Sequence, residues 1–311
     1  MKRTLFILLG FIGLFVTVGW AQTVPLRIVS YNVENLFHPE HDSLKDDIEW
    51  TEEGERRWSY TRYYRKEENI ARVLTNIGEW DGVDIVGLCE VENALVVKRL
   101  CYTLRRNEYD FVHYDSPDRR GIDVALIYKK ARIDTLCTRA IPVSDQELIT
   151  RDILYVCARV DKQDTLHLFV CHMPSQRDGA AESEWKRIIA KSVLQTAVDS
   201  VFASDSSAKI IVMGDMNCAP QDDIKGLTNR MTGLEREGRG THKHEGRWTC
   251  LDQFYTSANL NSLSVVRIYD AEWIQEPDEQ FLGLKPKRTY HGFNYQNGYS
   301  DHLPILLECR K

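Results

Sequence analysis

The chain of 311 residues lacks most of the features by which a sequence reveals its class directly. It has no internal repeat, no low-complexity tract and no linker rich in Pro, Gly or Ser, so nothing marks a domain boundary. No CxxC pair or Cys/His spacing typical of a zinc site is present. There is also no G-x-S-x-G motif, and no side chain stands out as a covalent nucleophile.

Positive charge is also in short supply, because the formal net charge is −6. Non-specific binding of nucleic acid usually depends on a basic surface, so a polyanion would here have to be held by a local patch. After the N-terminal segment, no apolar run is long enough to cross a membrane. The composition, with 43% hydrophobic and 28% charged residues, is that of an ordinary globular protein.

The N-terminus has the residue order of a secretory signal peptide. The charged Met1-Lys2-Arg3 precedes the uncharged, apolar Thr4–Trp20, and Gly19 and Ala21 are small residues of the kind that a signal peptidase reads. A membrane anchor is the competing interpretation, since the apolar stretch is nearly long enough to span a bilayer. We predict cleavage near Ala21, which would leave residues 22–311 as one secreted or periplasmic domain without a membrane anchor. The formal charge would become about −8, because Lys2 and Arg3 are lost.

Eight cysteines would permit disulfides in an exported chain. However, Cys89, Cys157 and Cys171 lie inside apolar runs, and a chain of this length does not need disulfides to build a stable core. Buried thiols and disulfides both remain open at this point.

Short apolar runs rich in β-branched residues alternate with longer amphipathic segments. The runs predict strands, and the segments, with apolar residues three and four apart, predict helices. Such a mixture is typical of an α/β protein built around buried sheets. The expected strands are Leu26–Tyr31, Asp84–Cys89, Val124–Tyr128, Leu154–Val160, Thr165–Cys171, Lys209–Met213, Leu251–Tyr255 and Pro304–Glu308, and the expected helices are Lys66–Glu79, Ala94–Arg106 and Glu182–Phe202.

Several expected strands end in, or follow, a compact polar cluster. Active sites of layered sheet proteins are commonly built at such strand ends. The clusters supply carboxylates, amides and two histidines, and oxygen-rich sites of this kind suit a hard cation, Mg²⁺, Mn²⁺ or Ca²⁺. Without a protein nucleophile, the inventory indicates an attacking water assisted by a metal and a base. The clusters are Tyr31–Asn35, Cys89–Asn93, Cys171–Ser175, Gly214–Asn217 and Ser300–His302.

The order of these motifs resembles the endonuclease/exonuclease/phosphatase superfamily, and the resemblance extends from about Leu26 to Cys309. It implies a four-layer α/β sandwich in which two mixed β-sheets pack face to face, with helices on both outer faces. It also implies a metal-dependent hydrolase that acts on phosphate ester bonds. The motifs are Tyr31-Asn32-Val33-Glu34, Glu90, His172-Met173-Pro174-Ser175, Gly214-Asp215-Met216-Asn217, Leu251-Asp252-Gln253-Phe254 and Ser300-Asp301-His302-Leu303-Pro304.

The resemblance further implies a metal role for three carboxylates. Glu90 matches the family's principal metal-binding glutamate, and Asp301 completes the metal environment. Asn32 and Glu34 match first-motif positions that support the metal, although the family varies at the position of Glu34. The implied cofactor is Mg²⁺, with Mn²⁺ or Ca²⁺ as alternatives.

The remaining motif residues match positions that act on the substrate and the attacking water. Asp215 and Asn217 match the pair that activates and orients the water. His302 matches the histidine that contacts the scissile phosphate, and Asp252 matches the aspartate that orients it. His172 matches a second phosphate-side residue, often regarded as the acid. Members of the family differ in which of these residues is the base and which the acid.

Further residues are candidates for substrate binding. Ser175 and Arg177 follow His172 and are candidates for binding a substrate phosphate, as are Lys287 and Arg288. An aromatic and basic segment precedes Glu90; it could stack bases and hold phosphates, or form a solvated loop leading into an amphipathic helix, which we favour. This segment contains Trp50, Trp58, Tyr60, Tyr63 and Tyr64 among Arg56, Arg57, Arg62, Arg65 and Lys66. The other polar residues next to the motifs, Asn35 and Glu92, are interpreted as loop-forming.

The sequence therefore predicts an exported, monomeric, metal-dependent phosphoesterase that hydrolyses phosphodiester bonds with activated water. A nuclease, with nucleic acid as its substrate, is the first hypothesis. The alternative is a phosphatase or phosphodiesterase acting on a lipid or a small phosphorylated molecule, which the acidic chain favours. A lipid-directed enzyme would be expected to carry an exposed apolar hairpin, and the sequence shows no convincing one. An inactive binding protein on the same fold is disfavoured, because the candidate catalytic residues are all intact.

Overall fold

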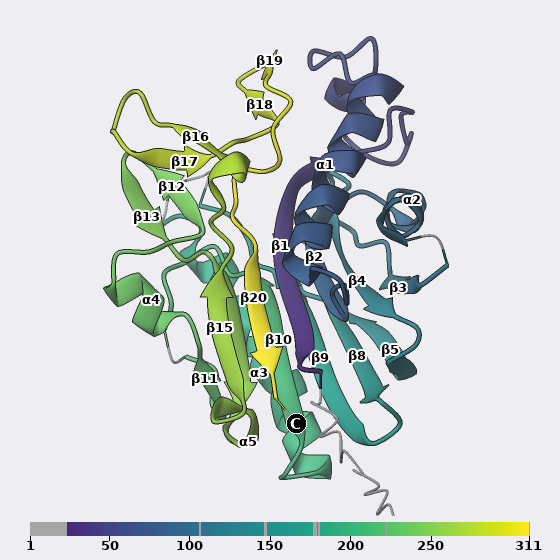
Figure 1. Ribbon diagram of the computed structural model, residues 1–311, viewed down its shortest axis with the longest axis vertical. Helices are drawn as coiled ribbons and strands as arrows, with labels where there is room; N and C mark the ends of the chain where they lie inside the picture. The colour runs from purple at the N-terminus through teal and green to yellow at the C-terminus, as the bar shows by residue number, and fades with distance from the viewer. Residues whose placement is uncertain are drawn as a thin grey trace, which may run out of the picture.

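The computed structural model describes residues 24–105, 107–145, 148–176, 179, 181–221 and 223–310. Two six-stranded sheets lie face to face at its centre (Figure 1). The first sheet has the order β15 (Ser264–Ile268), β20 (Ile305–Cys309), β1 (Leu26–Leu36), β2 (Ile85–Val91), β4 (Asp123–Lys129) and β3 (Tyr109–His113). The second has the order β11 (Leu227–Asn229), β14 (Asp252–Ser257), β10 (Lys209–Asp215), β9 (Asp164–His172), β8 (Ile153–Val160) and β5 (Ile133–Ile141).

Helices cover the outer faces of both sheets. The apolar sides of α1 (Tyr60–Gly78) and α2 (Ala94–Arg105) belong to the core of the first sheet, and that of α3 (Glu184–Ser204) packs on the second sheet. Each sheet is mixed, because β1 pairs with β2 and β9 with β10 in parallel while the other ladders are antiparallel. The predicted four-layer α/β sandwich is therefore confirmed. None of the helices in the described residues is long and apolar enough to span a bilayer.

The expected strands and helices are all present, although their ends differ. The first helix begins at Tyr60 rather than at Lys66, and β1 continues through the first motif to Leu36. Strands β3, β5, β11 and β15 of the two sheets are not among those expected from the sequence; β5 is exposed over most of its length, so its sequence lacks a clear apolar run. Short elements add to the sandwich: η1 (Ile48–Trp50), η2 (Glu272–Ile274), α4 (Thr232–Arg236), α5 (Ala258–Asn261), β6 (Ser144–Asp145) and β7 (Leu148–Ile149).

Three small hairpins lie together beyond one end of the sheets (Figure 1). The sequence does not predict them, because each strand is too short to show a period. They are β12 (His242–His244) with β13 (Arg247–Thr249), β16 (Gln275–Pro277) with β17 (Leu284–Pro286), and β18 (Tyr290–His291) with β19 (Asn294–Tyr295).

Three of the five aromatic residues in the aromatic and basic segment belong to the core, so its interpretation as solvated is wrong for these three. Trp50, Trp58 and Tyr63 are buried. The ring of Trp50 stacks on Phe37 with centroids 5.0 Å apart, and Trp58 Nε1 donates a hydrogen bond of 2.8 Å to the Phe37 carbonyl. These rings are therefore already packed and unavailable to stack on a nucleic-acid base.

The cysteines do not form disulfides. All eight are free thiols, and five of them are buried. Cys89 Sγ donates a hydrogen bond of 3.3 Å to the Cys171 carbonyl, which links the two sheets directly. The chain relies on its apolar core rather than on covalent cross-links.

Gly214 is the position where the fold tolerates a side chain least. Its φ is +137°, and a Cβ there would lie 1.8 Å from the Cys171 carbonyl oxygen. Gly214→Ala is expected to destabilise the protein by roughly 2–6 kcal/mol, because backbone strain and overpacking add. Urea unfolding measures this, with Gly233→Ala as the control, since no heavy atom lies within 4 Å of a Cβ there. Equal stability of the two variants would show that the backbone at Gly214 relaxes freely.

Candidate functional site

The register of the second sheet places three motif residues in one row. Asp215 at the end of β10 is paired with His172 of β9 on one side and with Asp252 of β14 on the other. All three side chains are buried. Because paired residues on neighbouring strands point to the same face of a sheet, these three motifs meet without any help from loops.

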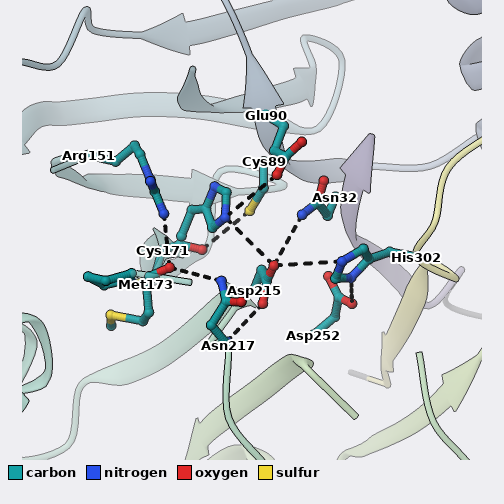
Figure 2. Close-up of polar contacts among 12 residues, drawn as sticks. Asn32, Cys89, Glu90, Arg151, Cys171, Met173, Asp215, Asn217, Asp252 and His302 are labelled. Carbon is teal, nitrogen blue, oxygen red and sulfur yellow. Dashed lines mark hydrogen bonds and ion pairs between the residues drawn. The ribbon is translucent and has the colours of Figure 1, made fainter. Parts of the chain in front are cut away.

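Asp215 lies at the centre of the polar contacts (Figure 2). Its Oδ2 accepts a hydrogen bond of 3.1 Å from Asn32 Nδ2 of the first sheet. Its Oδ1 accepts one of 2.8 Å from the Asn217 backbone N–H. Asn217 has a φ of +49°, and its Nδ2 donates to the Met173 carbonyl at 2.9 Å. The carboxylate is thus held by groups from both sheets.

The two histidines flank Asp215. His172 Nε2 lies 3.7 Å from Asp215 Oδ2 and 3.9 Å from Glu90 Oε1. His302 Nε2 lies 3.9 Å from Asp215 Oδ2, and His302 Nδ1 is hydrogen bonded to Asp252 Oδ2 at 2.7 Å. The second bond fixes the orientation of the ring and leaves Nε2 directed toward Asp215.

Two bulges in the first sheet turn the other carboxylates toward this centre. The β1/β2 ladder shifts between Asn32 and Leu36, and the β2/β4 ladder shifts between Cys89 and Val91. Glu90, which is inside the second bulge, has a φ of +66°. Its Oε2 accepts a hydrogen bond of 2.9 Å from the Asn35 N–H, whereas Oε1 has only His172 at 3.9 Å. Bulges re-aim side chains in this way, and here Oε1 is left available for a cation.

Glu34 and Asp301 form a network with two cations. The Glu34 carboxylate accepts a hydrogen bond of 2.6 Å from the Thr289 N–H and lies 3.4 Å from Arg288 Nε and 3.9 Å from Lys66 Nζ. Arg288 also contacts Asp301 Oδ2 at 2.7 Å. Arg288, predicted as a phosphate ligand, therefore binds two carboxylates of the site. Lys66, predicted in a solvated segment, is fully buried beneath them.

Burial sets the charge states of this cluster. It raises the pKa of Asp215 to about 6, with Asp252 adding to the shift and His302 opposing it. Burial and Asp301 together raise the pKa of Glu34. For Asp301, the effect of burial is outweighed by His302, Arg288 and nearby cations, so its pKa falls to about 2. Burial disfavours a charged His302, but Asp252 and the neighbouring carboxylates outweigh it and raise the pKa of His302 well above its usual value.

The cluster opens into a cleft of about 750 Å³. Glu90, His172, Asp215, Asp301 and His302 all line it, and so does Ser175. Arg177 lies outside the described residues. Asp252 stands behind this lining, since it is hydrogen bonded to His302, and Glu34 is linked to it through Arg288, which contacts both Glu34 and Asp301.

Several residues that line or support the cleft were missed in the sequence. Arg120 lines it and donates a hydrogen bond of 3.1 Å to Asn35 Oδ1, so Asn35, interpreted as loop-forming, contacts both Arg120 and Glu90. His242 and Arg247 reach the cleft from the β12–β13 hairpin, and His242 forms a β-bridge with His302. In the sequence, nothing marks His242 or Arg247 as residues of the cleft. Arg120 is marked only by its positive charge close to the start of β4.

More than one set of side chains here has the spacing of metal ligands. Ligand atoms of His242, Asp301 and His302 lie within 4.8 Å of one another. Glu90 adds an oxygen on the opposite side of Asp215, next to His172. Four acidic side chains, Glu34, Glu90, Asp215 and Asp301, converge in this region, so the chemistry of the donor set fits a cation that prefers oxygen ligands.

The fold and this constellation define a phosphoesterase. The chain belongs to the endonuclease/exonuclease/phosphatase family, whose model matches residues 27–311. It is a metal-dependent hydrolase that acts on phosphate ester bonds. No curated protein matches the sequence.

Solved structures share the fold at low identity. A mannosyl-6-phosphatase from Bacteroides thetaiotaomicron has a TM-score of 0.59 and 16% identity, over 91% of this chain and 98% of that chain. The human Nocturnin catalytic domain with bound sulfate has a TM-score of 0.56 and 16% identity, over 91% of this chain and 93% of that chain. D. rerio TDP2 complexed with a single-strand DNA product has a TM-score of 0.55 and 17% identity, over 92% of this chain and 99% of that chain.

The Asp252 contact predicts the titration of His302. Because Asp252 and its neighbours raise the pKa of His302, the ring is expected to remain doubly protonated above pH 6.5, the ordinary pKa of histidine. Asp252→Asn should lower this pKa. Ring ¹⁵N chemical shifts across a pH titration measure the pKa of His302 in the unmodified protein and in Asp252→Asn, with His291, an exposed histidine, as an internal reference. An unchanged His302 titration in Asp252→Asn would mean that the contact does not set its charge.

Proposed function

We propose that the protein is an exported nuclease that hydrolyses phosphodiester bonds with water activated by Asp215. The observation that carries the proposal is the placement of cations on two sides of the acidic centre. Arg120 enters from the Glu90 side through Asn35, and Arg247 enters from the His302 side through the β12–β13 hairpin. A phosphodiester whose chain continues in both directions would meet a positive side chain on each side.

Asp215 is the proposed base and Asn217 orients the same water. The pKa of about 6 leaves Asp215 ionised at neutral pH while it keeps enough basicity to accept a proton. The backbone bond from Asn217 and the side-chain bond from Asn32 fix the direction of the carboxylate. Asn32, which the family resemblance linked to the metal, would in this geometry act through Asp215.

The histidines are proposed to serve the phosphate. His302, held by Asp252 and protonated, would stabilise negative charge on the phosphoryl oxygens. His172, 3.7 Å from Asp215 and 3.9 Å from Glu90, would face the leaving oxygen and supply its proton. Ser175 at the cleft edge, together with Arg177, would bind a flanking phosphate.

Glu90 and Asp301, supported by Glu34, are the proposed metal ligands. A bound Mg²⁺, or Mn²⁺ or Ca²⁺ in its place, would polarise the phosphate and neutralise developing charge. Arg288 already links Glu34 and Asp301, so these carboxylates are positioned before any cation arrives.

Action on a lipid phosphate is a second candidate, favoured by exposed apolar side chains at the hairpins. Phe281 and Leu282, between β16 and β17, are 42% and 79% exposed, and Phe293, between β18 and β19, is 58% exposed. The sequence alone shows no convincing apolar hairpin. Side chains of this kind beside a cleft can insert into a lipid surface.

A substrate panel tests the proposal. We expect the purified protein to cleave plasmid DNA or RNA in Mg²⁺ or Mn²⁺ and to lose all activity in EDTA. Sphingomyelin, inositol phosphates and bis-p-nitrophenyl phosphate complete the panel. Metal-dependent turnover of a lipid or a phosphomonoester with no cleavage of nucleic acid would overturn the nuclease assignment.

The same preparation tests export, since an exported protein should begin at Gln22 by N-terminal sequencing.

Two substitutions separate water activation from metal binding. Asp215→Asn keeps the shape of the side chain but removes its basicity, so turnover should fall about 10²–10⁴-fold while substrate binding survives. Glu90→Gln should weaken metal binding, so part of its loss should return at high Mg²⁺ or Mn²⁺. Added metal should not rescue Asp215→Asn. If calorimetry shows equal loss of metal affinity in both variants, Asp215 is itself a principal ligand.

A further inference from the structure

A second cluster of ionisable side chains lies outside the cleft, at the outer edge of the first sheet. His113 ends β3, Asp123 begins β4, and Asp115 lies in the loop between these two strands. One ligand atom from each of the three lies within 4.8 Å of the others. The proposed chemistry of the cleft uses none of them.

The two buried members of the cluster are separated by an unusual distance. His113 Nε2 and Asp123 Oδ2 are 3.6 Å apart, on side chains that are 2% and 1% exposed. Neither atom has a hydrogen-bond partner. The gap is too long for a direct hydrogen bond, but two ligand atoms that share one ion at about 2.0–2.4 Å lie roughly 3–4 Å apart. The spacing therefore fits a shared cation better than a direct contact.

The rest of the cluster is oriented in the manner of a metal site. Asp123 Oδ1 accepts hydrogen bonds from the backbone N–H and the hydroxyl of Ser116, which leaves Oδ2 facing His113. Metal-binding carboxylates are commonly held by such outer partners. Asp123, Ser116 and Asp152 line a small cavity of about 10 Å³ between the sheets, and Asp152 Oδ1 is also buried without a partner. Among the described residues, no lysine or arginine forms an ion pair with Asp115, Asp123 or Asp152.

We propose that His113, Asp115 and Asp123 form a second divalent cation site, distinct from the metal site of the cleft. One imidazole and two carboxylates suit a transition-metal ion of the Zn²⁺ type better than Mg²⁺ or Ca²⁺, which prefer oxygen ligands alone. Such an ion ties β3, β4 and their connecting loop together. The same loop carries Arg120 to the cleft, so the ion also fixes the position of a proposed substrate-binding residue.

Metal analysis tests this site in a protein in which the ligand sets of the cleft are altered. The full chain carrying Glu90→Gln, His242→Gln and Asp301→Asn is stripped with chelator, incubated with Zn²⁺, desalted and analysed for metal per chain. One equivalent of Zn²⁺ should remain. Adding His113→Gln or Asp115→Asn should remove that equivalent, whereas His167→Gln, which alters a half-buried histidine away from the cluster, should leave it in place.

Two further measurements keep the test decisive. Asp115 is exposed, so Asp115→Asn should not disturb folding, and circular dichroism checks this. The Asp115→Asn variant therefore tests the site even if His113→Gln unfolds. Ser116→Ala should weaken Zn²⁺ binding by about 10- to 100-fold, as loss of an outer partner does elsewhere. The proposal is overturned if the cleft-disabled protein binds no Zn²⁺, or if it still holds one equivalent after Asp115→Asn.

Discussion

The strand register across β9, β10 and β14 is the constraint on which the site depends. It aligns His172, Asp215 and Asp252 in one row, so a slip of one residue in either ladder would turn a side chain to the opposite face of the sheet. Gly214 keeps this register, because its missing Cβ lets β10 approach the Cys171 carbonyl closely. The apolar residues between the two sheets pack them together, and the hydrogen bond from Asn32 to Asp215 joins the sheets at the centre of the site.

The concentration of buried acid is a cost that the surrounding structure offsets. Like charges in a low-dielectric interior repel, and each carboxylate loses solvation. Lys66 and Arg288 provide the opposite charge, although burial lowers the pKa of Lys66 to about 8 against the attraction of Glu34. The Thr289 N–H adds a hydrogen bond to the same carboxylate. The site is thus assembled from a helix, a strand and a loop far apart in sequence, and Lys66, Arg288 and the Thr289 N–H all oppose the rise in the pKa of Glu34.

The sequence allowed prediction of those parts of the site that follow directly from strand ends. Asn32, Glu90, His172 and Asp215 stand at the ends of apolar runs, and parallel pairing of β1 with β2 and of β9 with β10 then brings those ends together. Arg120, His242 and Arg247 could not be found in this way, because a loop and a short hairpin carry them and their positions depend on tertiary contacts. The burial of Lys66 cannot be predicted for a related reason: its partners Glu34 and Thr289 are remote in sequence, so a lysine in a basic segment is expected to be solvated. The pairing of His113 with Asp123 likewise arises only when β3 and β4 lie side by side.

The place of β20 in the first sheet has a consequence for when the protein can become active. This strand inserts between β15 and β1, and Asp301 and His302 lie shortly before it in the chain. Because β15 joins β1 only through β20, the first sheet lacks a strand in its middle until this part of the chain has been synthesised. Asp301 and His302 are made only just before it. The order of strands along the chain thereby delays assembly of the site until β20 is available to pair.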